Sequence, residues 1–234
     1  MSMERKPLSV EAAVNYLREE CFSSIVFDVD DTLYRRSDPY IRAYHKCFQK
    51  HIRNENGWPA GIELYRTSRV YVEEEYRRRV LGEIDMEEML IRRTLRSFAA
   101  CGVCLTEEEA LLFEEIYEQE QSHIQLIPQF EALLDALAGS GQGVFLGILT
   151  NGPLGHQKRK IHALGLARWI PEEHIVVSGD IGVSKPDLEA FRIYERKCCV
   201  RPENTVMVGD NLAADIQGAE AAGWNALWVD AGIQ

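Results

Sequence analysis

Short apolar runs alternate with amphipathic helical patterns in two parts of the chain. The runs cover residues 23–28, 143–149, 174–178, 205–208 and 226–229. They lack the alternation of a half-exposed strand, so we predict strands that are buried on both faces. Helical patterns cover residues 10–20, 128–138, 154–164, 186–199 and 212–222. Ser9 caps the first of these helices, and Pro186 fits the first turn of the fourth. Alternating strands and helices predict an α/β fold, a doubly wound parallel sheet with helices on both faces.

The segment from about residue 36 to 126 has a different pattern, with apolar residues at helical spacing and no strand signal. The predicted helices cover residues 39–54, 62–81, 85–100 and 106–123. Pro39 and Thr106 are start signals, and Gly57 and Gly102 are stop signals. We therefore predict two domains: an α/β core from residues 1–35 and 127–234, and an inserted bundle of about four helices from residues 36–126.

The composition is that of an ordinary globular protein, with 46% hydrophobic and 27% charged residues in 234. The net charge of -11 disfavours nucleic acid and anionic membranes as partners. No run is apolar enough to cross a bilayer, and the first residues lack a signal-peptide core, so we expect a cytoplasmic protein. The same charge repels phosphorylated compounds, so a phosphate site here needs a metal ion or a well-placed lysine.

One arginine-rich stretch, Arg66 to Arg96, admits two interpretations: a nucleic-acid surface or a solvated helix. Three glutamates precede three arginines by four residues each: Glu73, Glu74 and Glu75 before Arg77, Arg78 and Arg79. That order favours ion pairs along one exposed helix, so we favour the solvated helix.

Three of the predicted strands end in polar clusters. The clusters are Asp28 with Asp30, Thr150 with Asn151, and Asp210 with Asp215. Sites in open parallel sheets form at the carboxyl ends of the strands, so these clusters should converge. Lys185 lies in a loop after another strand and can reach the same edge.

Such a set suits phosphoryl chemistry. Clustered carboxylates need a cation, and their oxygens suit Mg²⁺, which also binds phosphate. A carboxylate can attack phosphorus to form an acyl phosphate. Lys185 would neutralise charge on the nucleophile and the transferring group, and Thr150 with the amides after it would donate hydrogen bonds to phosphoryl oxygens.

These residues resemble the four ordered motifs of the haloacid-dehalogenase-like hydrolase superfamily. The matching segments are Asp28-Val-Asp30-Asp-Thr32, Thr150-Asn151-Gly152, Lys185-Pro186 and Gly209-Asp210-Asn211-Leu-Ala-Ala-Asp215. The helical insertion resembles the helical cap of this superfamily, which closes over the substrate. The resemblance covers about residues 23 to 230 and implies a Rossmann-like core.

The resemblance implies roles for each motif residue. Asp28 would be the nucleophile, and Asp30 would protonate the leaving oxygen and then activate water. Mg²⁺ would be held by Asp28, Asp210 and the backbone carbonyl of Asp30. The phosphoryl group would be held by Thr150, Asn151 and Lys185. Asp215 would lie behind them, near Lys185 or the waters of the metal.

The expected function is therefore hydrolysis of a small phosphate monoester through an aspartyl-phosphate. The run Phe27 to Tyr34, Thr150-Asn-Gly and the later Gln157-Lys158 look most like pyrimidine 5′-nucleotidase-type and related small-metabolite phosphatases. The expected substrate is a small phosphorylated metabolite, with nucleoside monophosphates and sugar phosphates among the candidates. A phosphomutase and a non-catalytic phosphometabolite-binding module stay open as alternatives. Asp30 disfavours a dehalogenase. The sequence leaves monomer and dimer equally open.

Overall fold

The computed structural model describes residues 6–54, 57–139, 141 and 143–232. The chain divides into two compact units. One is formed by residues up to Arg35 together with Ile124–Gly232, and the other by Arg36–His123. The second boundary lies after His123 because Ile124 and Ile127 are both buried in the core of the first unit.

The first unit is built on a six-stranded sheet whose paired strands are all parallel. The strands are β1 (Leu8–Ser9), β2 (Ser24–Phe27), β3 (Phe145–Thr150), β4 (Ile175–Val177), β5 (Thr205–Gly209) and β6 (Asn225–Asp230), in the order β1-β6-β5-β2-β3-β4. In this register Phe27 pairs with both Ile148 and Val208, so β2, β3 and β5 end side by side. The prediction of a doubly wound parallel sheet is confirmed.

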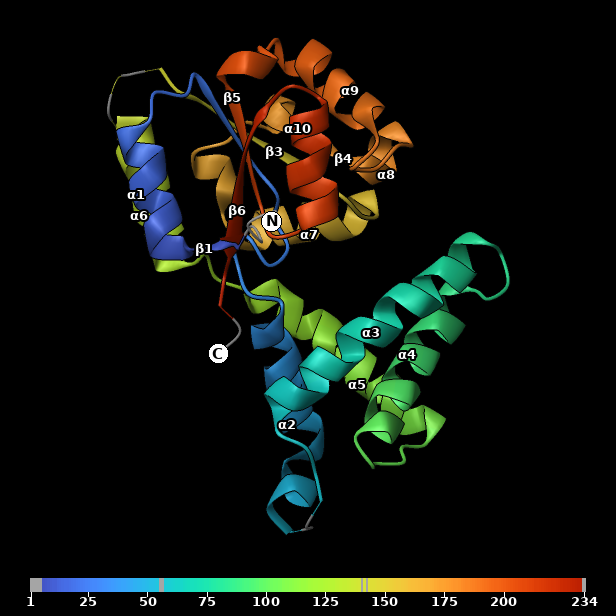
Figure 1. Ribbon diagram of the computed structural model, residues 1–234. Helices are drawn as coiled ribbons and strands as arrows, with labels where there is room; N and C mark the ends of the chain where they lie inside the picture. The colour runs from blue at the N-terminus through green and yellow to red at the C-terminus, as the bar shows by residue number, and fades with distance from the viewer. Residues whose placement is uncertain (1–5, 55–56, 140, 142, 233–234) are drawn as a thin grey trace, which may run out of the picture. The chain divides into compact units, whose positions relative to one another are not determined.

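Alternate residues of the central strands face two separate apolar layers. Ile25 and Phe27 pack in one layer with α1 (Val10–Glu19), α6 (Pro128–Gly139) and α7 (Leu154–Ala163). Val26 and Met207 pack in the other with α9 (Leu188–Cys198) and α10 (Gly218–Ala221). Figure 1 shows α1 and α6 on one side of the sheet and α9 and α10 on the other. Burial on both faces explains why the central strands carry apolar residues on both faces.

Four local features of this unit differ from the sequence prediction. The strand β1 was not predicted, because two residues carry no periodicity. Helix α9 begins at Leu188 and not at Pro186, because the Asp187 side chain accepts a hydrogen bond from the backbone N–H of Glu189 and caps the helix there. The predicted helix over residues 212–222 is a π-helical segment, Leu212–Gln217, followed by α10. A short helix α8 (Ser178–Ile181) also follows β4.

The second unit is helical throughout its regular structure. It contains α2 (Ser37–Asn54), α3 (Gly61–Val80), α4 (Met86–Ala100) and α5 (Glu107–Glu120), followed by a 3₁₀ turn, Gln121–His123. Aromatic side chains dominate its core: Tyr40, Tyr44, Phe48, Phe98 and Phe113 are all buried. Edge-to-face ring pairs such as Tyr40 with Phe113 stabilise this packing. Across the described residues, no helix has both the length and the apolarity to cross a membrane.

The arginine-rich stretch is organised differently from our prediction of ion pairs along one helix. Glu75 is fully buried on α3, and it accepts hydrogen bonds from Arg92 and Arg96 of α4 as well as from Arg78. Glu74 also pairs with Arg96, whereas the Glu73 side chain lies outside the described residues. Among the described side chains, Glu74 and Glu75 have partners other than those expected at i,i+4, because helix packing brings α4 within reach of these glutamates. The expected pair of Glu73 with Arg77 stays a prediction. The arginines stabilise the α3–α4 contact.

Candidate active site

The strand-end clusters predicted from the sequence lie at one edge of the sheet. Asp28 follows β2 directly, Thr150 is the last residue of β3, and Asp210 follows β5. The backbone N–H of Asp28 donates to the carbonyl of Val208 at 2.9 Å, which ties the first cluster to the end of β5. Carboxylate oxygens of Asp28, Asp210 and Asp215 all lie within 4.8 Å of one another.

Lys185 lies at the centre of this group, and its side chain is 1% exposed. Its Nζ donates to Asp28 Oδ1 at 2.9 Å and to the carbonyl of Leu149 at 2.6 Å, and it pairs with Asp215 Oδ1 at 2.6 Å. Burial alone would lower the pKa of Lys185, but the charges of Asp215 and Asp28 outweigh it and raise the pKa above the ordinary value. The lysine is therefore a fixed positive charge beside two buried carboxylates.

The backbone of Lys185 is held by a single side chain from the neighbouring strand end. Asn151 Nδ2 donates to the carbonyl of Lys185 at 2.8 Å, and the N–H of Lys185 donates to Asn151 Oδ1 at 3.0 Å. Both ends of the Asn151 amide are thus committed to the loop that carries the lysine. The role of Asn151 in holding phosphate stays a prediction, and its visible contacts are those of a residue that positions Lys185.

Asp215 is held from the other side by the loop after β5. The N–H of Asn211 donates to Asp215 Oδ2 at 3.0 Å, while Asn211 Oδ1 caps the π-helical segment by accepting from Ala213 and Ala214. A Cβ on Gly209 would lie only 2.3 Å from Asp215 Oδ2. Only glycine therefore leaves room for this carboxylate under the end of the strand.

The electrostatic balance of the site is negative. Burial raises the pKa of Asp28 to about 6, and the nearby charges of Asp215 and Asp30 add to the effect, while Lys185 opposes it. One lysine does not offset the carboxylates gathered around it. A divalent cation with oxygen ligands, such as Mg²⁺, fits this donor set in charge and in chemistry.

Asp30 is surrounded by side chains to which the sequence analysis assigned no role in the site. Lys160 Nζ lies 2.8 Å from both oxygens of the Asp30 carboxylate, Gln157 Nε2 donates to Oδ2 at 2.8 Å, and the Tyr34 hydroxyl donates to Oδ1. Gln157 and Lys160 are three residues apart on α7, so they share one face of that helix. That spacing, just after Thr150-Asn151-Gly152, is the signal that could have found them. Lys158, singled out with Gln157, pairs with Glu172 instead.

The hydroxyl of Thr150 is poised for a ligand. Thr150 is 1% exposed, and its Oγ1 is among the few buried side-chain atoms in the described residues without a hydrogen-bond partner; the others are in Thr32, Tyr40 and Gln157. A buried hydroxyl without a partner costs stability. Its position beside Asp28 at the strand ends suits a donor to a bound oxygen.

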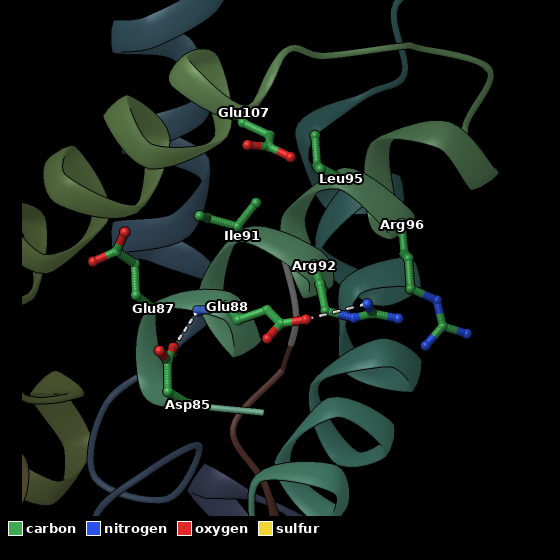
Figure 2. A pocket seen from close by; sticks show the side chains of 8 residues that line it. All are labelled: Asp85, Glu87, Glu88, Ile91, Arg92, Leu95, Arg96 and Glu107. Atoms are coloured by element: carbon green, nitrogen blue, oxygen red, sulfur yellow. Dashed lines mark hydrogen bonds and ion pairs between the residues drawn. The ribbon is translucent and has the colours of Figure 1, made fainter. Parts of the chain in front are cut away.

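The helical unit carries a groove of about 550 Å³ that is lined only by residues of that unit (Figure 2). It is lined by Asp85, Glu87, Glu88, Ile91, Arg92, Leu95, Arg96 and Glu107. Its carboxylates are exposed, Asp85 caps α4, and both arginines pair with glutamates of α3. An acidic groove whose cations are already paired is unsuited to a phosphate ester, so we place the active site at the sheet edge.

A doubly wound sheet with an inserted helical segment, and with aspartates and a lysine at its carboxyl edge, is typical of a class of hydrolases built on a Rossmann-like core. The chain belongs to the haloacid dehalogenase-like hydrolase family: the family profile of that description matches residues 22–223. The resemblance predicted from the four motifs is confirmed.

Characterised relatives are named as phosphatases. Phosphoserine phosphatase of Thermus thermophilus is 36% identical over 127 residues, which span 54% of this chain and about half (49%) of that enzyme. Glyceraldehyde 3-phosphate phosphatase of Methanopyrus kandleri is 29% identical over 204 residues, 86% of this chain and 80% of that enzyme. The magnesium-bound crystal structure of the HAD hydrolase YfnB of Bacillus subtilis superposes with a TM-score of 0.64 at 24% identity, covering 89% of each chain. The prediction of a hydrolytic enzyme of phosphatase type is confirmed by this kinship.

Proposed function

We propose that the protein is a Mg²⁺-dependent phosphatase of small phosphorylated metabolites, with Asp28 as the nucleophile. The observation that carries the proposal is the placement of Asp28 at a strand end, with one oxygen held by Lys185 and with Asp215 and Asp210 alongside. Lys185 fixes Oδ1 and thereby orients the carboxylate for attack through its second oxygen. Burial keeps this nucleophile away from bulk water.

Mg²⁺ would be held by the side chains of Asp28 and Asp210 and by the backbone carbonyl of Asp30. When bound, it would supply positive charge against the phosphate oxygens. Asp215 is already engaged by Lys185 and by the N–H of Asn211, so we assign it to positioning the lysine and not to binding the metal directly.

The proposed reaction has two steps. In the first, a carboxylate oxygen of Asp28 forms a bond to phosphorus, the ester bond breaks, and Asp30 donates a proton to the leaving oxygen. In the second, Asp30 accepts a proton from water, the water oxygen bonds to phosphorus, and the bond from phosphorus to Asp28 breaks. The products are inorganic phosphate and a free Asp28 carboxylate. Lys185, the Thr150 hydroxyl and Asn151 would bind phosphoryl oxygens through both steps.

The substrate class follows from the relatives, whose names refer to phosphoserine and glyceraldehyde 3-phosphate. We propose a small phosphate monoester of this kind; nucleoside monophosphates and sugar phosphates belong to the same class. We also propose that the helical unit, Arg36–His123, is the cap of the enzyme. A phosphomutase would use the same aspartyl-phosphate, and a dehalogenase shares the fold. The presence of Asp30 and its hydrogen-bonded surroundings favours phosphate chemistry.

The test is release of phosphate from p-nitrophenyl phosphate and from a panel of phosphorylated metabolites, with and without Mg²⁺. We expect Asp28→Asn to abolish release, while Asp180→Asn, a change at an exposed carboxylate of α8, leaves it intact. Full activity of Asp28→Asn would refute the nucleophile. A sugar phosphate converted to its isomer without free phosphate would indicate the mutase, and chloride release from a haloacid would indicate the dehalogenase.

A further inference from the structure

Lys160 is a buried lysine with a dedicated partner. It is 9% exposed on α7, and its Nζ lies at 2.8 Å from both Oδ1 and Oδ2 of Asp30. Burying an ammonium group costs free energy unless it is paired. Lys158 on the same helix behaves as an ordinary surface lysine: its side chain is 54% exposed and pairs with Glu172, which is 79% exposed.

The surroundings of Asp30 match its ionised form. Lys160 contributes donors to both oxygens, the Tyr34 hydroxyl donates to Oδ1, and Gln157 Nε2 donates to Oδ2. Every one of these groups is a donor, and an ionised carboxylate is an acceptor only. The orientation of Asp30 is fixed as well, since donors from α7 and from Tyr34 hold opposite oxygens.

The donors are themselves held in place. Gln157 Nε2 also donates to the carbonyl of Asn151 at 2.7 Å, which links Asp30 to the second motif. A Cβ on Gly152 would lie 2.8 Å from Gln157 Nε2, so glycine there leaves room for the amide. Gln157 is 2% exposed and Tyr34 is 1% exposed.

We propose that Lys160, Gln157 and Tyr34 are positioning residues that hold Asp30 as the proton acceptor for the hydrolysis of the aspartyl-phosphate. The inference rests on the proposed function, because it presupposes a phosphorylated Asp28. In that step water gives a proton to Asp30, its oxygen bonds to phosphorus, and the bond from phosphorus to Asp28 breaks. The three donors favour the charged, oriented carboxylate that this step needs.

The two steps of the reaction therefore depend differently on Lys160. A p-nitrophenolate leaving group departs without a proton, so formation of the aspartyl-phosphate from p-nitrophenyl phosphate does not need Asp30 as an acid. Hydrolysis of the intermediate still needs Asp30 as a base. Loss of Lys160 should slow the second step selectively, whereas a merely structural defect would slow both.

The experiment is rapid-mixing kinetics with p-nitrophenyl phosphate and Mg²⁺ on the full chain. The initial burst of p-nitrophenolate reports the first step and steady-state turnover reports the second. For Lys160→Met we expect turnover to fall by about 10- to 100-fold while the burst rate changes little, so that phosphorylated Asp28 accumulates. Lys160→Arg, which keeps the charge and the donors, should recover part of the loss. Lys158→Met is the matched control and should behave as the wild type.

The outcomes separate the two proposals. If the wild-type protein never carries a phosphoryl group on Asp28 during the reaction, the proposed function is overturned, and this inference with it. If wild-type Asp28 does become phosphorylated, but the ratio of burst rate to steady-state turnover is the same in the wild type and in Lys160→Met, this inference alone is overturned. If Lys160→Met does not fold, Tyr34→Phe removes a single hydroxyl donor, and the ratio should then rise by a few-fold; an unchanged ratio again overturns the inference.

Discussion

Replacing Asp28, the proposed nucleophile, should stabilise the protein. Asp28 is buried among other charges, and its pKa is raised from the ordinary 3.8 to about 6. A raised pKa means that the folded state disfavours the ionised carboxylate compared with the unfolded chain. Asp28→Asn keeps the shape of the side chain and removes the charge. We therefore expect this variant to unfold at higher denaturant concentration than the wild type at neutral pH, in the absence of divalent cations.

The size of the effect follows from the shift. A difference of about two pKa units corresponds to about 3 kcal/mol between the two protonation states. The shift already includes the attraction of Lys185, which opposes the burial of the charge. The asparagine amide is also polar and adds a smaller burial cost of its own. We expect Asp28→Asn to raise the free energy of unfolding by about 1 to 3 kcal/mol at pH 8.

The pH dependence gives the sharper test. The stabilising contribution of a carboxyl with a raised pKa is fully present below its unfolded value, here 3.8, and is lost as the pH rises through about 6. Wild-type stability should therefore lose this contribution between about pH 4 and pH 6. Asp28→Asn has no titrating carboxyl at this position, so its stability should not change for this reason. The difference in free energy of unfolding between the two proteins should be small at pH 4 and should approach its full size by pH 7.

The assay is urea unfolding followed by circular dichroism, with EDTA present, at pH 4.5 and pH 8. Asp180→Asn is the control, since it removes an exposed carboxylate. Addition of Mg²⁺ at pH 8 should narrow the gap, because a cation that binds the native wild type stabilises it by mass action. An Asp28→Asn variant that is less stable than the wild type at pH 8, or a gap of equal size at both pH values, would refute the reasoning.

Two further changes test the supports of the site and of the helical unit. Gly209→Ala should cost about 1 to 3 kcal/mol in urea unfolding and abolish phosphate release, because its Cβ would meet Asp215 at 2.3 Å. Gly155→Ala on α7 should be harmless, because its Cβ would lie 3.8 Å from the Arg159 side chain, an ordinary van der Waals contact. Equal behaviour of the two variants would contradict the steric argument. Glu75→Gln should lower the free energy of unfolding by about 1 to 3 kcal/mol at pH 7, since its buried carboxylate pairs with Arg92 and two other arginines. Burial would raise the pKa of Glu75, but the arginines hold it below its ordinary value. The loss of stability in Glu75→Gln should therefore shrink as the pH falls below 4.5, measured by thermal unfolding. A loss that stays constant with pH would count against the ion pairs.

The sheet could be predicted from the sequence because its information is local. A strand buried on both faces is mostly apolar on both, as in Ile25 to Phe27 before Asp28, and a cluster of polar residues follows where the strand ends. Thr150 is the last residue of its strand, and Asp210 follows its own strand directly. Parallel pairing then brings all the ends to one edge, so a pattern in the chain predicts convergence in space without any long-range information.

The partners of Asp30 and Glu75 could not be predicted in the same way. Lys160 and Asp30 are 130 residues apart, and whether a lysine on a surface helix turns inward depends on how that helix packs. Glu75 stands in a run of exposed-looking charges, and only the packing of α4 on α3 makes it buried. Periodicity identifies the apolar face of a helix, but it does not distinguish a charge in solvent from a charge that meets a partner.

The structure around Lys185 explains what the proposed cation would contribute and why so much of the chain supports this site. Three carboxylates lie close together around one buried ammonium group. The carboxylates repel one another, so holding them in place costs free energy of folding. Asn151 holds the backbone of the lysine, and Gly209 leaves room for Asp215. These residues perform no chemistry themselves, yet without them the carboxylates would move apart and relieve their repulsion. A bound divalent cation removes the same repulsion without movement, and so the arrangement that is costly for folding is the one that is ready for phosphoryl transfer.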